Sequence, residues 1–288
     1  GWFSYRWTQI FDMGRIPSSS TVLKARTAGA GRQMPFAPAP IDEVVATIRK
    51  EKPAVVFAPH VETSAGLVLP DDYLKAVADA AHEVGGLFVL DCIASGALWV
   101  DMKATGVDVV ISAPQKGWTG SPCCAFVMLG ERARTAIDST TSNSFAIDLR
   151  KWLQIMETYE SGAHMYHTTM PTDALTRTRD VMLETKALGF EKLRASQLEL
   201  GRKARATLVC RGFPSVASEG GVQSGKCFLA VGLQSASGVP LQCDEGPDFK
   251  TFRLGLFGLE KLQHIDRTVQ NLEAALDRIA GAGQRAAA

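Results

Sequence analysis

Lys116 and Asp91 are the two residues whose type and position are best suited to chemistry. Lys116 follows an apolar run at residues 107–111, and Asp91 directly ends a second apolar run, Leu87–Leu90. A lysine amine can form an imine with an aldehyde, and a carboxylate can keep a neighbouring nitrogen protonated. Taken singly, a lysine at a strand end is usually a solvated side chain, and an aspartate there is at least as often a helix cap. At the ends of adjacent strands, however, the two groups could reach opposite sides of one ring.

Three short motifs surround these residues in order. They are Glu62-Thr63-Ser64-Ala65-Gly66, Asp91-Cys92-Ile93-Ala94-Ser95-Gly96 and Ala113-Pro114-Gln115-Lys116-Gly117-Trp118. Together they resemble the class V aminotransferases of fold type I, above all the alanine–glyoxylate and serine–pyruvate branch. The resemblance continues through Arg150–Leu153, Met165–Pro171 and Phe252–Gly258, so that it covers most of the chain. The set is specific, whereas any one of these motifs alone is weak.

The resemblance implies that the cofactor is pyridoxal 5′-phosphate and assigns a role to each matching residue. Lys116 matches the lysine that forms the Schiff base, and Asp91 matches the partner of the pyridine nitrogen. Thr63 matches the residue that hydrogen-bonds the ring hydroxyl. Phe3 matches the aromatic residue that stacks on the ring, although by itself it reads as a core phenylalanine. Gln115 matches a position near the phosphate.

Three further positions carry implications for substrate and assembly. Tyr166 and Thr169 match residues that reach the phosphate of the neighbouring subunit's cofactor, which implies a homodimer with shared active sites. Arg253 matches the arginine that binds the substrate carboxylate, a task suited to the guanidinium because it binds carboxylates through two hydrogen bonds. The alternative for Arg253 is a structural ion pair with a nearby acid, namely Asp244, Glu245 or Asp248.

Apolar periodicity predicts the elements that must position these residues. Short apolar runs predict buried strands, and helical spacing predicts amphipathic helices. The predicted strands are 54–58, 87–90, 107–111 and 125–129, and the predicted helices are 41–50, capped by Asp42, and 71–84. Buried strands separated by helices indicate an α/β fold with a mostly parallel sheet, in which ligands bind at the carboxyl ends of the strands.

The second half of the chain differs in pattern. Residues 172–211 are nearly continuous helix with a break at 188–190, where we place a domain border. Residues 1–188 would form the large cofactor-binding domain. Residues 189–288 would form a small α+β domain, with strand-like pieces at 226–231 and 251–256 and a final helix at 259–279.

The charge balance and the cysteine content indicate which classes of protein the chain can belong to. The 288 residues include 31 basic and 30 acidic side chains, which argues against binding to nucleic acid or to a membrane surface. The six cysteines are scattered without a C-x-x-C motif, a pattern typical of reduced thiols in an intracellular enzyme. We therefore expect a cytoplasmic protein, with the peroxisome or mitochondrion as alternatives.

Two weaker signals predict no site. Gly29-Ala30-Gly31 lacks the third glycine of a dinucleotide-binding motif and is not followed by a helix start. His164 and His167 have a spacing that metals can use, but no carboxylate or cysteine completes a metal site.

The predicted activity is transfer of an amino group between a small amino acid, such as alanine, serine or glycine, and a 2-oxo acid such as glyoxylate or pyruvate. One alternative is a lyase or desulfurase on the same fold, with Cys243 as the cysteine to watch, although Gln115 before the lysine counts against it. Another is a truncated, non-catalytic paralogue. Family members carry a Ser/Gly-rich phosphate-binding turn upstream of the position of Gly1, and the stretch 218–224 is shorter than expected. We therefore expect either a part of a longer chain or a truncated relative.

Overall fold

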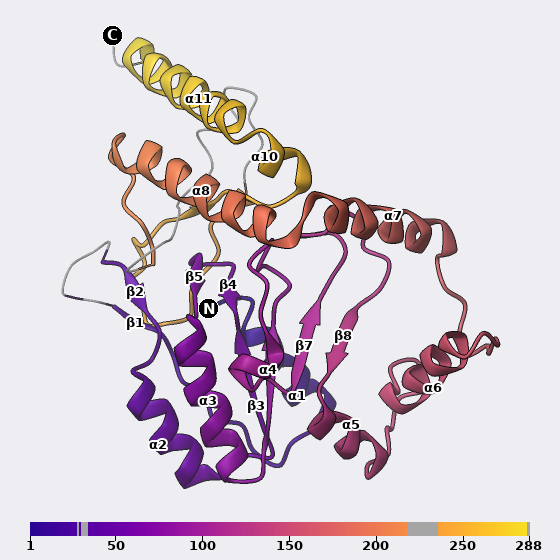
Figure 1. The fold of residues 1–288 in the computed structure, drawn as a ribbon. Helices are drawn as coiled ribbons and strands as arrows, with labels where there is room; N and C mark the ends of the chain where they lie inside the picture. Colours follow the sequence, from indigo (N-terminus) through magenta and orange to yellow (C-terminus); the bar gives the residue numbers. More distant parts are fainter. Residues whose placement is uncertain (28, 30–33, 218–235, 287–288) are drawn as a thin grey trace.

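The computed structural model describes residues 1–27, 29, 34–217 and 236–286 (Figure 1). The predicted strand at 226–231 and the stretch 218–224 lie outside the described residues, as do two residues of the discounted glycine motif, Ala30 and Gly31. Within the described parts, no helix is both long enough and apolar enough to cross a lipid bilayer.

A four-stranded sheet with the order β3-β6-β7-β8 forms the centre of the molecule. Its strands are β3 (Val55–Pro59), β6 (Leu87–Asp91), β7 (Val109–Ser112) and β8 (Phe126–Leu129). The first three run parallel, and β8 pairs antiparallel with β7. The α/β fold with a mostly parallel sheet is therefore confirmed, and the four strands predicted in the first half of the chain are all present.

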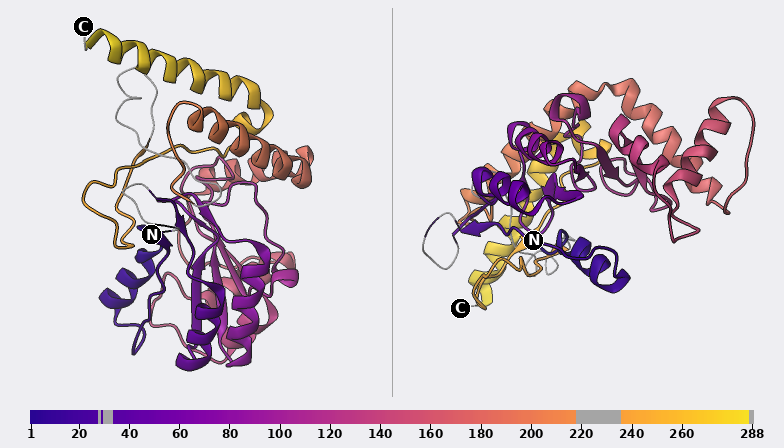
Figure 2. Two further views of the ribbon diagram at one scale, coloured as in Figure 1. Left: turned by 90° about the vertical axis from the view of Figure 1, so that its left-hand side faces the viewer. Right: turned by 90° about the horizontal axis from the view of Figure 1, so that it is seen from below.

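Helices α2 (Ile41–Glu51), α3 (Asp71–Glu83) and α4 (Met102–Thr105) cover one face of the sheet (Figures 1 and 2). The buried side chains of α2 and α3 pack on Phe88, Leu90 and Val110, which point to this face. The predicted cap of α2 was wrong, because Pro40 occupies the N-cap and Asp42 lies in the first turn. A carboxylate in that turn still interacts favourably with the helix dipole.

Helix α1 (Tyr5–Gly14) lies against the opposite face (Figure 2). The ring of Trp7 lies 4.5 Å from that of Phe57, and the ring of Phe11 lies 5.1 Å from it, measured between centroids. Val89 and Val109 belong to the same cluster. Since successive strand residues point to opposite faces, Phe88 and Val89 serve two different layers, and the sheet is buried on both sides.

The C-terminal half lies across the carboxyl ends of the strands (Figure 1). Helix α7 (Thr172–Leu188) is separated from α8 (Phe190–Val209) by Gly189, which has a φ of 92°, as the predicted break requires. The division into domains at this point stays a prediction. On α8 pack the helices α10 (Leu259–Gln263) and α11 (Ile265–Ala286).

The prediction of one helix at 259–279 was wrong, because His264 has non-helical dihedral angles (φ −132°, ψ 54°) that end α10 before α11 begins. The C-terminal part also contains a short antiparallel strand pair, β9 (Ala236–Ser237) with β10 (Phe252–Arg253). A second short pair, β1 (Arg26–Thr27) with β2 (Phe36–Ala37), lies near α2.

Between β8 and α7 the chain forms an arm that begins beside the sheet, where Ala133 packs against Val89 and Val109, and then extends away from it (Figure 1). The arm, residues 131–171, contains α5 (Glu131–Asp138) and α6 (Leu149–Glu160). Asp148 caps α6 by accepting hydrogen bonds from the backbone N–H groups of Arg150 and Lys151, which satisfies donors that the helix itself leaves unpaired.

Candidate active site

Asp91 is the last residue of β6, at the carboxyl edge of the sheet. In the strand register it lies between Pro59 of β3 and Ile111 of β7. Its Oδ1 atom accepts a hydrogen bond from the Ile93 N–H at 2.9 Å. Burial raises the pKa of Asp91, with a contribution in the same direction from the charge of Glu62, while the Ile93 hydrogen bond opposes the shift. A cation beside this carboxylate would therefore be strongly favoured.

Lys116 lies in a turn after β7, which we call the Lys116 turn (residues 113–119). The turn is closed by hydrogen bonds from the Gly120 N–H to the Pro114 carbonyl at 2.8 Å and from the Thr119 N–H to the Lys116 carbonyl at 3.1 Å. A Cβ atom at Gly117 would lie 2.7 Å from the Gly96 carbonyl oxygen. The Lys116 turn thus packs directly on the Asp91 loop (residues 92–98), so both predicted cofactor contacts lie at one edge.

Thr63 is half-buried in the turn of a small hairpin formed by β4 (Val61–Glu62) and β5 (Leu67–Val68). The hairpin follows β3, and the His60 N–H donates to the Asp91 carbonyl oxygen at 2.8 Å. This hydrogen bond holds the start of the hairpin against the end of β6. Thr63 therefore lies at the same edge of the sheet as Asp91.

Glu62 is a residue of this site that sequence reasoning did not select. Its side chain is only 6% exposed, and its carboxylate accepts hydrogen bonds from the backbone N–H groups of Phe3 and Ser4 at 3.4 and 3.1 Å. It also accepts from the Ser64 hydroxyl at 2.7 Å. Glu62 thereby fixes the backbone of Phe3 next to Thr63. Glu62 could have been predicted as a site residue from its position in the first motif, one residue before Thr63.

Arg253 reaches this cluster from β10. Its guanidinium carbon lies 5.1 Å from the centroid of the Phe3 ring, a cation–π distance. Burial lowers the pKa of Arg253, and the charge of Glu62 opposes that shift. Two residues 250 positions apart in the sequence are thus neighbours.

Two of the acids considered as structural partners for Arg253 have other contacts. Asp244 forms an ion pair with Lys24 at 2.8 Å. Glu245 accepts hydrogen bonds from the backbone N–H groups of Leu241, Gln242 and Cys243. Asp248 is therefore the acid that stays open as a structural ion-pair partner of Arg253.

The remaining predicted residues point outward. Gln115 is exposed at the start of the Lys116 turn. Tyr166 is 76% exposed on the arm, and its hydroxyl lies 3.3 Å from the Thr169 hydroxyl. In the described part of the chain, neither arm residue bonds to any of the other site residues. Within one chain the structure therefore unites Phe3, Thr63, Asp91 and Arg253 with the Lys116 turn, but not the arm.

The two arm histidines form no metal site. Within the described ranges, no group of His, Cys, Asp and Glu side chains could hold a metal ion. His167 instead donates from Nε2 to the Phe145 carbonyl at 2.9 Å and packs against the Phe145 and Trp152 rings, which is a packing role.

Comparison with known proteins gives this arrangement its context. No protein-family model matches the chain. A 2-aminoethylphosphonate–pyruvate transaminase of Paraburkholderia phymatum is 32% identical over 144 residues, which are 48% of this chain and 35% of the relative. An alanine–glyoxylate aminotransferase of Callithrix jacchus is 27% identical over 154 residues, 52% of this chain and 36% of the relative. The alignments thus span about a third of the length of these curated relatives.

The fold agrees with these sequence matches. An alanine–glyoxylate aminotransferase structure from Nostoc sp. superposes with a TM-score of 0.71 and 21% identity, over 95% of this chain and 73% of the other. A pyridoxamine–pyruvate aminotransferase from Mesorhizobium loti superposes with a TM-score of 0.68. These homologues and structural neighbours are class V pyridoxal-phosphate aminotransferases. The predicted family resemblance and fold type I are confirmed.

The residues at the sheet edge fit the cofactor of the class V aminotransferases. Asp91 is half-buried, and in the described part of the chain no residue bonds to its Oδ2 atom. That atom suits a protonated ring nitrogen, which would also compensate the burial of the carboxylate. Lys116 supplies an amine on a tightly packed turn, and Thr63 supplies a hydroxyl. The roles of the individual residues stay predictions.

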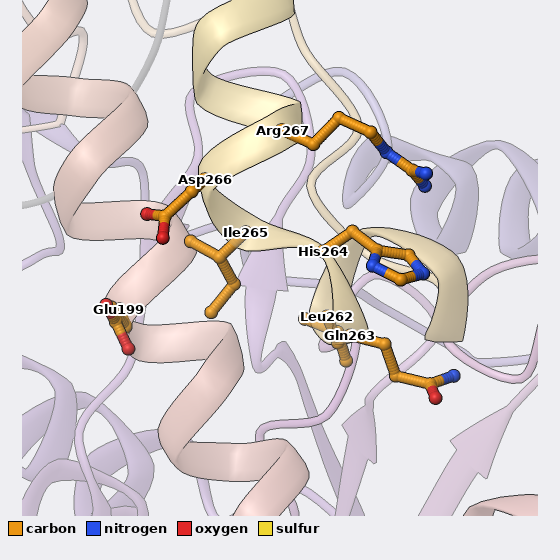
Figure 3. Close-up of a pocket in the computed structure, with 7 residues that line it drawn as sticks. All are labelled: Glu199, Leu262, Gln263, His264, Ile265, Asp266 and Arg267. Atoms are coloured by element: carbon orange, nitrogen blue, oxygen red, sulfur yellow. The ribbon is translucent and has the colours of Figure 1, made fainter.

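A hollow elsewhere on the molecule is unrelated to this site (Figure 3). It measures about 410 Å³ and lies where α8 meets α10 and α11; its lining residues are Glu199, Leu262, Gln263, His264, Ile265, Asp266 and Arg267. Asp266 forms an ion pair with Lys203 at 2.6 Å, and Arg267 forms one with Glu260. Since these charges are already compensated, we assign no ligand to the hollow.

Proposed function

We propose that the protein is a pyridoxal-phosphate-dependent transaminase that moves an amino group between a small amino acid and a 2-oxo acid. The observation that carries this proposal is the meeting of the Asp91 carboxylate, the Lys116 turn, the Thr63 hairpin and the Arg253–Phe3 pair at one edge of the sheet. This edge is where open α/β sheets bind ligands.

The residues divide the work as follows. When bound, pyridoxal phosphate supplies an aldehyde that condenses with amines and a ring that withdraws electrons from the substrate α-carbon. Asp91 would keep a proton on the ring nitrogen, and the Lys116 amine would accept the α-proton of the substrate. Phe3 would pack against the ring. Arg253 binds the substrate carboxylate and orients the α-carbon.

The names of the relatives point to small primary amines as donors and small 2-oxo acids as acceptors. These names pair alanine with glyoxylate and 2-aminoethylphosphonate with pyruvate. We propose alanine, serine or glycine as amino donors and glyoxylate or pyruvate as acceptors. Incubating the purified protein with added cofactor, alanine and glyoxylate should produce pyruvate and glycine; absence of both products with every donor–acceptor pair would refute the proposal.

The desulfurase alternative has little support. A cysteine desulfurase needs a reactive cysteine thiolate that attacks the sulfur of the substrate cysteine and takes that sulfur up as a persulfide. Cys243 is only 7% exposed, and burial raises the pKa of its thiol. A cysteine desulfurase from Thermococcus onnurineus shares the fold at 12% identity, a much weaker match than those of the transaminases.

A homodimer is part of the proposal. The arm exposes Phe145, Ile147 and Tyr166 to 74%, 73% and 76%, and α1 exposes Met13 to 88%. Large exposed apolar side chains of this kind mark interaction surfaces. A second copy of the chain that covers the arm would bring Tyr166 and Thr169 to the neighbouring site.

Replacing Arg253 with lysine should raise the KM for the amino acid about ten- to hundredfold, because a two-pronged charged contact is worth about 1.5–3 kcal/mol. The resting absorbance of the bound cofactor and the melting temperature should barely change. Absorbance titration with alanine and serine beside a melting curve measures both. Arg211→Lys, which alters a surface ion pair with Asp277, is the matched control. Unchanged amino-acid binding with a lowered melting temperature would identify Arg253 as a structural residue.

Mixing two inactive variants tests the shared site. A Lys116→Ala chain combined with a Tyr166→Phe/Thr169→Ala chain should yield one fully native site in each heterodimer, and hence about half of the wild-type activity. The reason is that the intact Lys116 of one chain then meets the intact arm of the other. Differently tagged chains allow the heterodimer to be isolated and assayed. If verified heterodimers recover no activity, Tyr166 and Thr169 serve their own chain.

A further inference from the structure

Three segments of the proposed site meet at one junction: the Asp91 loop, the Lys116 turn and the Arg253 segment (residues 252–258). The Asp91 loop and the Lys116 turn are already in contact through Gly96 and Gly117. A Cβ atom at Gly96 would also lie 3.2 Å from the Phe257 Cβ, in the Arg253 segment. The backbone of Gly96 is therefore enclosed by the other two segments.

Gln197 of α8 bridges two of these segments through its amide group. Its Nε2 donates to the Leu256 carbonyl at 2.8 Å, and its Oε1 accepts from the Ala97 N–H at 3.4 Å. A Cβ atom at Gly96 would lie 2.5 Å from this Oε1 atom, so the bridge needs a glycine there. One uncharged side chain thus links the Arg253 segment to the Asp91 loop.

Thr119 links the end of the Arg253 segment to the Lys116 turn. Its hydroxyl accepts a hydrogen bond from the Leu259 N–H at 3.4 Å, while its own N–H donates to the Lys116 carbonyl at 3.1 Å. Its φ is +60°, a left-handed conformation that is unusual for a β-branched residue. Strained residues of this kind persist where the surrounding structure holds them, often at functional sites.

We infer that Gln197 and Thr119 are positioning residues that hold Arg253 at a set distance from Asp91 and Lys116. This inference rests on the proposed transaminase function. The β10–β9 pairing holds the chain at Arg253 itself, and the two links hold it at Leu256 and Leu259, just beyond. Both links are uncharged, so their loss changes the geometry of the site and leaves its charges in place. Substrate binding should suffer more than the chemistry at Lys116.

The test compares Gln197→Leu, Thr119→Val and the double variant of the whole protein. Thr119→Ser keeps the hydroxyl and should behave as wild type. Thr176→Val is the matched control, because among the described residues the Thr176 hydroxyl bonds only to the Thr172 carbonyl, one helical turn away. Hydrogen exchange of peptides covering residues 252–262 reports the junction directly. Absorbance titration of the cofactor-loaded protein with alanine reports amino-acid affinity.

Each single variant should speed exchange in residues 252–262 and weaken alanine binding about three- to tenfold, the range of one neutral hydrogen bond. The double variant should exceed the product of the two, because both links hold the same segment. Borohydride trapping of the cofactor on Lys116 should stay at the wild-type level. A lowered melting temperature with unchanged exchange and unchanged alanine affinity would overturn the inference.

A different result would overturn the proposed function instead. If the wild-type protein binds the cofactor but responds to no amino acid, the transaminase proposal fails. The exchange measurement then still decides whether Gln197 and Thr119 hold the Arg253 segment: faster exchange in both variants supports the junction, and wild-type exchange refutes it.

Discussion

Replacing Lys116 with alanine is expected to abolish both transamination and the borohydride-stable link between protein and cofactor. The amine is the group that condenses with the cofactor aldehyde and then moves the substrate α-proton, and alanine can do neither. The turn itself should survive, because the hydrogen bonds that close it involve backbone atoms only. Mass spectrometry of the reduced, digested protein locates the link, and a product assay measures turnover.

Lys103→Ala is the matched control for this experiment. Lys103 is exposed in α4 and lies outside the three motifs of the proposed site, and its loss should leave both readouts at the wild-type level. Recovery of the reduced adduct on any other lysine of the wild-type protein would show the assignment of Lys116 to be wrong.

Replacing Asp91 with asparagine should reduce kcat about 10²- to 10³-fold while the cofactor stays bound. Removing one such electrostatic contact typically costs about 3–4 kcal/mol in the transition state. An amide can still accept the Ile93 hydrogen bond but cannot stabilise a protonated ring nitrogen as a carboxylate does. Stopped-flow measurement of α-proton removal, with deuterated alanine as a comparison, isolates the affected step.

The structure supplies a matched control for the competing view that Asp91 is only a cap. Asp101 caps α4 by accepting hydrogen bonds from the Lys103 and Ala104 N–H groups at 2.9 and 3.0 Å. Asp101→Asn should change stability by about 1 kcal/mol or less and leave kcat unaffected. If Asp91→Asn behaves in the same way, Asp91 is a cap and the partner of the ring nitrogen lies elsewhere.

Much of the sheet could be predicted from the chain because apolar runs of four or five residues have few alternatives to buried strands. The run at 125–129 shows the limit of this reasoning. An apolar run carries no direction, so the antiparallel pairing of β8 with β7 could not be read from it. The break at His264 was missed for a related reason: the helical spacing of apolar residues continues across it, although the backbone turns there.

The candidate site likewise has a part that the sequence predicts and a part that only the tertiary structure shows. The motifs around Thr63, Asp91 and Lys116 are short contiguous stretches of sequence. Their resemblance to known enzymes can therefore be recognised without knowledge of the fold. The contacts of Gln197 with Leu256 and of Thr119 with Leu259 join residues 59 and 140 positions apart. No periodicity or motif encodes such a pair, because the two partners meet only after the helices have packed across the strand ends.

The sequence by itself determined which groups are available: one lysine and one aspartate at strand ends, a threonine in a tight turn, and an arginine in the C-terminal part. Tertiary structure decided which of them share a site. In the folded chain, the Arg253 guanidinium lies 5.1 Å from the centroid of the Phe3 ring, and the buried Glu62 accepts hydrogen bonds from the backbone of Phe3 and Ser4. Tyr166 is exposed on the arm. The physical reason is that residue type sets the chemistry of a side chain, whereas burial and long-range packing set its neighbours, its pKa and the surface left for a partner.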